Sequence, residues 1–216
     1  MKDSPAVAAA AGLVLLGSLA ALAWTFVGPG PAGDPRVQEE IGRTLAREAV
    51  KHLGAGRRLT VLTRDTTAFP QPAADQVLAA FTREAARSGA TVAAVQRFEV
   101  DPLRPAQVPP GDFLELIRRS AAGDVLVSLL GPPLLGDDQR AQLPATPPCR
   151  IVAVCAGPFP DAAGLRQLAA QGLLQAAVVD RPQSRTAPPR SRSDRTFEQL
   201  YTVFEGGGTP GPGVSR

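Results

Sequence analysis

The sequence is poor in the residue types from which catalytic and metal sites are most often built. It contains one histidine, two cysteines and no asparagine, and aromatic residues make up 5% of the chain. The single histidine, His52, excludes a zinc site that needs a second histidine, and we expect His52 to interact with the dipole at the end of a helix. Because aromatic rings are few, the core must be built mainly from alanine, leucine and valine.

Lysine is also scarce, since Lys2 and Lys51 are the only lysines among 23 basic residues. The other basic residues are arginines, yet the formal net charge is +3, which is modest for a protein that binds DNA. We interpret the high arginine, alanine and proline content as a bias in the base composition of the gene. We therefore expect no nucleic-acid partner.

The two cysteines are placed unfavourably for a disulfide. Cys149 and Cys155 flank one predicted strand. A strand rises ~3.3 Å per residue, which puts them ~20 Å apart, whereas a disulfide requires Cα atoms within ~7 Å. We expect two free thiols. No histidine is placed to activate Cys155, so we interpret it as a small buried hydrophobic residue and not as a nucleophile.

Several common enzyme and cofactor motifs are absent. No G-x-G-x-x-G follows the first predicted strand, and there is no G-x-x-x-x-G-K-[ST] loop or G-x-S-x-G elbow. Gly-Pro and Arg-Pro follow the third and fifth predicted strands, where a phospho-receiver would need an acid and a lysine. We expect no cofactor, and an enzyme only if its site is of a kind that these motifs do not describe.

The N-terminal segment Ala6–Val27 carries no charge. A helix of ~20 apolar residues is long enough to cross a bilayer, so residues 1–28 are predicted to be a transmembrane anchor. A cleaved signal peptide ending at Ala21-Leu22-Ala23 is the main alternative, and a buried helix is another. We expect a single-pass protein of the inner membrane with its domain on the periplasmic side, the usual purpose of a short N-terminal anchor.

A spacer and an amphipathic helix follow at residues 29–56. Asp34-Pro35 supplies a helix start, and apolar residues then recur every four positions from Val37 to Leu53. Residues 57–182 alternate between short apolar runs and helical patterns. The predicted strands are 59–63, 91–95, 125–130, 151–155 and 175–179, and the predicted helices are 73–88, 113–121, 137–143 and 161–171.

This alternation predicts an α/β fold. Strands that alternate with helices form a parallel sheet with right-handed crossovers, and continuous apolar runs are typical of strands buried on both faces. We expect a three-layer Rossmann-like, specifically flavodoxin-like, domain with a parallel five-stranded sheet, preceded by the transmembrane helix. Residues 183–216 are a Pro/Ser/Arg-rich linker and tail that contains one apolar cluster at helical spacing, predicted to dock on something: Phe197, Leu200, Tyr201 and Phe204.

Ligands of open parallel sheets bind at the carboxyl ends of the strands. The candidate ligand-binding residues at those ends are Asp65, Thr66, Thr67, Phe69, Asp101 and Asp180. Three of them, Asp65, Asp101 and Asp180, are candidates for a shared cation. Because acidic residues also cap and solvate loops, we expect no metal ion.

The segment Val61–Val92 resembles the opening of the sugar-binding domains of type I periplasmic binding proteins and lactose-repressor-type regulators. In that family a strand ends in Asp, a loop with Asn-Pro and aromatic residues follows, and the next helix leaves through A-x-x-x-G-x-x-V. Here Asp65, Phe69 and Ala86…Gly89…Val92 correspond, and Gly123–Val127 is similar to a later strand of the family. The loop asparagine of the family is missing. The resemblance covers residues 57–182 and implies one of the two lobes that enclose a sugar.

Three functions remain open at this stage. The first is a membrane-anchored, non-enzymatic lobe that binds a partner, or weakly a small ligand, at the strand ends. The second is a structural or docking subunit of a cell-envelope complex that uses the tail cluster. The third is an enzyme with an unrecognised site. Fold alone does not decide among them. The expected partners are the lipid bilayer, through Ala6–Val27, and another protein or a second copy of the chain.

Overall fold

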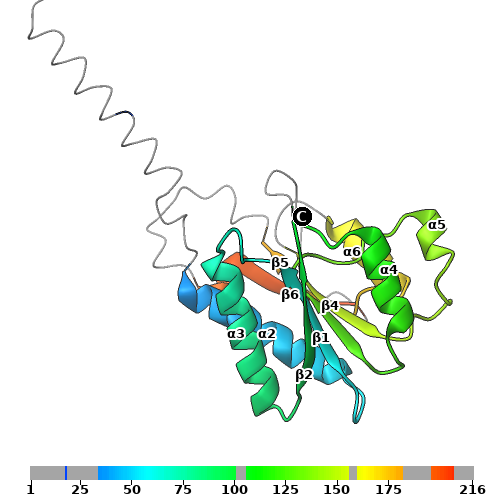
Figure 1. Ribbon diagram of the computed structural model, residues 1–216, viewed down its shortest axis with the longest axis horizontal. Coiled ribbons are helices and arrows are strands. Elements are labelled where there is room, and N and C mark those ends of the chain that lie inside the picture. Colours follow the sequence, from blue (N-terminus) through cyan, green and yellow to red (C-terminus); the bar gives the residue numbers. More distant parts are fainter. Residues whose placement is uncertain (1–17, 19–33, 101–105, 156–159, 182–195, 207–216) are drawn as a thin grey trace, which may run out of the picture. The chain divides into compact units, whose positions relative to one another are not determined.

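A computed structural model describes residues 34–100, 106–155, 160–181 and 196–206, together with Ser18 (Figure 1). The described residues from Asp34 onward belong to one compact unit. None of the helices within the described residues is both long and apolar enough to cross a membrane. The predicted anchor Ala6–Val27 lies outside the described residues except for Ser18.

Most predicted elements are present, with ends shifted by a few residues. The helices are α2 (Pro35–His52), α3 (Pro72–Arg87), α4 (Pro110–Arg119), α5 (Asp137–Arg140), α6 (Ala162–Ala170) and α7 (Phe197–Leu200). The strands are β1 (Leu59–Arg64), β2 (Val92–Phe98), β3 (Val125–Ser128), β4 (Arg150–Cys155), β5 (Ala176–Asp180) and β6 (Tyr201–Glu205).

The sheet confirms the parallel arrangement of the five predicted strands and adds a sixth. Its order is β2-β1-β3-β4-β5-β6, and β1 to β5 pair in parallel. The order of these five strands is that of flavodoxin-like folds. The prediction of a purely parallel five-stranded sheet is wrong at one edge, because β6 pairs with β5 in the antiparallel direction.

Helices α2 and α3 cover one face of the sheet, and α4 and α6 cover the other (Figure 1). On the first face, α2 and α3 pack side by side over a core cluster that includes Val61, Val127 and Val152. On the second face, α4 and α6 cover a separate cluster that includes Leu62, Leu126 and Ile151. Neighbouring residues of a strand thus enter different cores, as the pleat requires. The predicted three-layer arrangement is confirmed.

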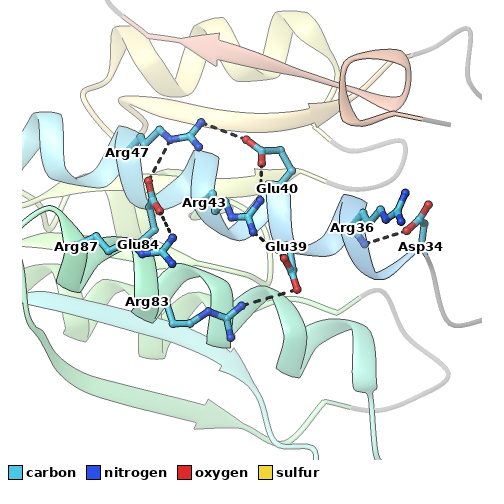
Figure 2. Close-up of polar contacts among 9 residues, drawn as sticks. All are labelled: Asp34, Arg36, Glu39, Glu40, Arg43, Arg47, Arg83, Glu84 and Arg87. Atoms are coloured by element: carbon cyan, nitrogen blue, oxygen red, sulfur yellow. Dashed lines mark hydrogen bonds and ion pairs between the residues drawn. The ribbon is translucent and has the colours of Figure 1, made fainter.

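The contact between α2 and α3 depends on a glycine and on charged side chains. Gly42 of α2 faces the backbone of α3, where a β-carbon would lie 2.4 Å from the carbonyl oxygen of Val77. Around this contact, Arg47 of α2 is 3.4 Å from Glu84 of α3, and Arg83 of α3 is 3.9 Å from Glu39 of α2 (Figure 2). The amphipathic helix is therefore an integral part of the α/β unit.

Strand β2 departs from the expectation that all strands are buried on both faces. It lies at the end of the sheet, and its five central residues, Ala93–Arg97, are exposed. An edge strand has a neighbour on one side only, and α4 packs over Leu62 and Leu126 of the inner strands. The apolar composition of β2 is thus no evidence of its burial.

The tail cluster also differs from the expectation of helical spacing. Only Phe197–Leu200 is helical, and Tyr201–Glu205 continues as strand β6. Phe197, Leu200 and Tyr201 pack against the core on the α2 side, and Phe204 packs against the core on the opposite face. The cluster docks on its own domain, with each of the four side chains half-buried.

Candidate functional site

The fold places a topological switch point between β1 and β3. These strands are neighbours in the sheet, but the chain leaves β1 toward β2 on one side and leaves β3 toward β4 on the other. In open α/β sheets the loops at such a point separate, and ligands bind there at the carboxyl ends of the strands. The loops concerned are 65–71, after β1, and 129–136, after β3.

The loop after β1 is held in shape by its own side chains. One carboxylate oxygen of Asp65 accepts hydrogen bonds from the N–H of Thr67 at 2.9 Å and from its hydroxyl at 2.6 Å. These bonds, with Arg97 nearby, hold the pKa of Asp65 below its ordinary value. The hydroxyl of Thr66 lies 3.2 Å from a carboxylate oxygen of Asp75 in α3. Asp65, Thr66 and Thr67 thus form an ordered polar turn, and the carboxylate of Asp65 is ionised at neutral pH.

Two large apolar side chains are exposed on the loops that flank the switch point. Phe69, in the loop after β1, is 64% exposed, and Leu134, in the loop after β3, is 38% exposed. In the loop after β3, Gly131 has φ of +92°. This conformation favours glycine and lets the loop turn sharply. We refer to Asp65, Thr66, Thr67, Phe69 and Leu134 as the switch-point surface.

The remaining candidates from the sequence do not join this surface. Asp180 ends β5, which is separated from β1 by β3 and β4, so Asp65 and Asp180 lie ~14 Å apart across the sheet. Asp101 lies outside the described residues. The idea that Asp65 and Asp180 share one cation is therefore wrong. Among the described residues, no group of three acidic, histidine or cysteine side chains is arranged to hold a metal ion.

A recess of about 440 Å³ lies elsewhere, between α4 and the uncovered face of β1 and β2. Its floor includes Thr60, Gln96 and Phe98, and its wall includes Glu115 and Arg119. The recess exists because α4 covers the inner strands and leaves β2 bare. No pattern in the sequence pointed to it, since it depends on where α4 sits over the sheet.

The buried carboxylate beside this recess, that of Asp124, has a structural role. One of its oxygens accepts a hydrogen bond from the backbone N–H of Arg58, and the other accepts from the backbone N–H of Ala121 and from the Arg58 guanidinium, all at 3.0 Å. Burial acts to raise the pKa of Asp124, but these bonds outweigh it and the pKa is lowered. Asp124 thereby joins the beginnings of β1 and β3.

The cysteines and the histidine are not arranged for chemistry. Cys149 and Cys155 are free, as predicted, and both are buried. Burial raises the pKa of Cys149 to about 11 and that of Cys155 to about 12, so neither is a thiolate at neutral pH. His52 is half-buried in the last turn of α2, where burial lowers its pKa.

Comparison with known proteins yields structural neighbours only, because no protein-family model and no curated protein matches the chain. The arabinose-transporter binding protein from Shewanella sp. ANA-3 is 16% identical, with a TM-score of 0.48 over 78% of this chain and 57% of its own. A solute-binding protein from Burkholderia graminis, solved with D-arabinose, is 18% identical, with a TM-score of 0.45 over 68% of this chain and 48% of its own.

A third neighbour, from Agrobacterium vitis and solved with α-D-tagatopyranose, is 21% identical, with a TM-score of 0.45 over 68% of this chain and 46% of its own. The chain therefore spans about half the length of the solved proteins it matches. These three neighbours are solute-binding or periplasmic binding proteins of ABC transporters.

Proposed function

We propose that the chain is a membrane-anchored, non-enzymatic binding domain that contacts its ligand through the switch-point surface. The observation that carries this proposal is the exposed ring of Phe69, two residues after the hydrogen-bonded turn Asp65–Thr67. An ordered loop has less conformational entropy to lose when it binds than a flexible one. The anchor rests on the uncharged length of Ala6–Val27.

A polyhydroxylated small molecule, such as a sugar, is the ligand class that fits this surface. A carboxylate accepts hydrogen bonds from hydroxyl groups, and the ring of Phe69 offers a flat apolar face for the C–H side of a sugar. The sequence resemblance over Val61–Val92 supports the same class. Binding is weak, because an open surface supplies few hydrogen bonds, each contributing ~1 kcal/mol in water. A dissociation constant near 1 mM corresponds to ~−4 kcal/mol.

Calorimetric titration of the purified full chain with D-arabinose, D-xylose and D-glucose tests this function. We expect dissociation constants of about 1 mM or weaker, and further weakening in Asp65→Ala and in Phe69→Ala. Glu115→Gln is the matched control, because Glu115 lines the recess on α4 and not the switch-point surface. Micromolar affinity would contradict the claim that the sugar binds to an open surface with few hydrogen bonds. Unchanged affinity in both Asp65→Ala and Phe69→Ala would show that the sugar binds at another site.

A protein ligand is the second candidate, favoured by the exposure of two apolar side chains from neighbouring loops. Phe69 and Leu134 are both exposed large apolar residues, and a protein that covers both loops would bury them. The Leu134→Ala variant separates the two candidates. It lowers affinity for a protein that covers both loops, whereas sugar binding at Asp65 and Phe69 persists.

A further inference from the structure

The open edge of the sheet at β2 has features of a pairing surface. Residues Ala93–Arg97 are exposed in succession, and Val95 is 40% exposed, although it is a large apolar residue in a strand. Natural edge strands are commonly protected by charged residues, proline or a bulge; β2 contains no lysine or proline, its one charged residue is Arg97, and its register shift lies at its beginning, between Val92 and Ala94. At the opposite edge, β6 is shorter, and Tyr201, Val203 and Phe204 are half-buried. The β2 edge is therefore the more available of the two.

The backbone of β2 shows which groups face outward. The N–H of Asp65 donates to the carbonyl of Phe98 at 2.8 Å, so the backbone of Phe98 points toward β1. Along a strand, the backbone groups of successive residues point to opposite sides. The N–H and C=O groups of Val95 and Arg97 therefore point away from the sheet, where another strand can pair with them.

We propose that this edge binds a second copy of the chain, with the two β2 strands antiparallel about a twofold axis at Gln96. In this register Val95 of each copy exchanges both backbone hydrogen bonds with Arg97 of the partner subunit. Phe98 lies opposite the small side chain of Ala94 of the partner subunit. The two Gln96 side chains meet at the axis, where their amides pair.

Neighbouring registers are less favourable. An axis at Arg97 would set the two Arg97 side chains directly opposite each other, and like charges in that position destabilise a pair. An axis at Val95 would place the Arg97 backbone against Ala93, the extra residue where the β1–β2 register shifts. A bulge leaves its extra residue unsuited to regular pairing. The register at Gln96 avoids both faults.

Charge complementarity favours a second copy over an unrelated strand. Helix α3 contacts β2 on one face, and α4 lies across the recess from β2 on the other. Both helices have an acid in the first turn and arginine in the last: Asp75 and Arg87 in α3, and Asp112, Arg118 and Arg119 in α4. Antiparallel pairing brings the acidic end of each helix toward the basic end of its counterpart. A twofold axis perpendicular to the sheet also keeps the α2 and α3 layers of both copies on the same side.

Cysteine cross-linking of the full chain in its membrane tests the register directly. Across the axis the two residues at position 96 form a pair without backbone hydrogen bonds, with Cα atoms ~4.5 Å apart, within the range for a disulfide. We expect Gln96→Cys to form a disulfide-linked dimer under mild oxidation. Thr202→Cys is the matched control, because Thr202 is exposed on β6 and its backbone faces β5 as that of Gln96 faces β1. The native cysteines are buried and do not interfere.

Sedimentation equilibrium of the full chain in detergent supplies a second measurement. Val95→Pro removes an outward-facing N–H without touching the β1–β2 bonds, and we expect it to raise the dimer dissociation constant by at least about tenfold. Val203→Pro, the equivalent change on β6, leaves the dimer intact. The proposal fails if the wild type is monomeric at about 100 µM, if Thr202→Cys cross-links as well as Gln96→Cys, or if Val203→Pro dissociates the dimer.

Discussion

Replacing Gly42 by alanine is the sharpest perturbation of the contact that joins α2 to the rest of the domain. A β-carbon at position 42 would lie 2.4 Å from the carbonyl oxygen of Val77, 2.8 Å from the β-carbon of Ala80 and 2.9 Å from the backbone nitrogen of Phe81. Two of these neighbours are backbone atoms, so rotation of a side chain cannot relieve the overlap. The helices must separate.

The expected cost combines two opposing effects. Overpacking costs about 3 kcal/mol at the upper end of its usual range, and alanine is better than glycine in a helix by about 1 kcal/mol. The net loss in the free energy of unfolding is therefore about 2 kcal/mol. For a domain of this size it lowers the melting temperature by about 4–8 °C.

Thermal and urea unfolding of the purified chain, followed by circular dichroism, measure this loss. The matched control is Gly111→Ala in α4, where a β-carbon would meet nothing within 4 Å. We expect Gly111→Ala to be as stable as the wild type or slightly more stable. If Gly42→Ala is as stable as this control, then α2 does not pack on α3 as the structure describes.

Other predictions concern the buried groups, the tail and the anchor. Asp124→Ala leaves two backbone N–H groups without their acceptor and should cost about 3 kcal/mol in urea unfolding. Because the pKa of Asp124 is lowered in the folded state, its contribution to the free energy of unfolding is present above the unfolded pKa of about 4 and is lost as the pH falls through the folded pKa. The stability difference between the wild type and Asp124→Ala should therefore become smaller in acid, and a difference that stays constant would contradict this. Iodoacetamide should label Cys149 and Cys155 only after denaturation, and rapid labelling of the native chain would refute their burial. Phe204→Ala should cost about 2 kcal/mol, whereas an unchanged melting temperature would mean that β6 is not docked. After cell fractionation the chain should remain in the membrane and keep residues 6–27, and a soluble product that begins near Trp24 would show that they are cleaved.

The order of the elements could be read from the sequence because their signals are local. The apolar run 59–63 became β1, at Leu59–Arg64, and the helical pattern 73–88 became α3, at Pro72–Arg87. In both cases the period of apolar residues and the residues that end the element lie within a single short window.

The errors arose where pairing partners decide the structure. The tail cluster has the spacing of a helix, but Tyr201–Glu205 pairs with β5, which is distant in the sequence. The stabilisation from strand pairing outweighs the local helical pattern. The exposure of β2 was hidden for a similar reason, since its apolar residues do not reveal that the strand lies at an edge.

The candidate site could be predicted in part. A polar turn after the first strand is visible in the sequence, and the structure joins Asp65 to Thr67 by two hydrogen bonds. Leu134 was missed, because a leucine in a loop gives no sign of whether it is exposed. Asp180 was wrongly grouped with Asp65, because the distance between two strand ends depends on the strand order.

Chemical-shift mapping of the isotope-labelled full chain, titrated with D-arabinose, is the most direct measurement of where this protein binds. The switch-point surface predicts that the amide signals of residues 65–69 shift together and saturate in the millimolar range, ~1 mM or above. Signals of Gln96 and Arg119 in the recess should stay unchanged. Shifts confined to the recess, or none in the 65–69 loop at saturation, would contradict binding at the switch point.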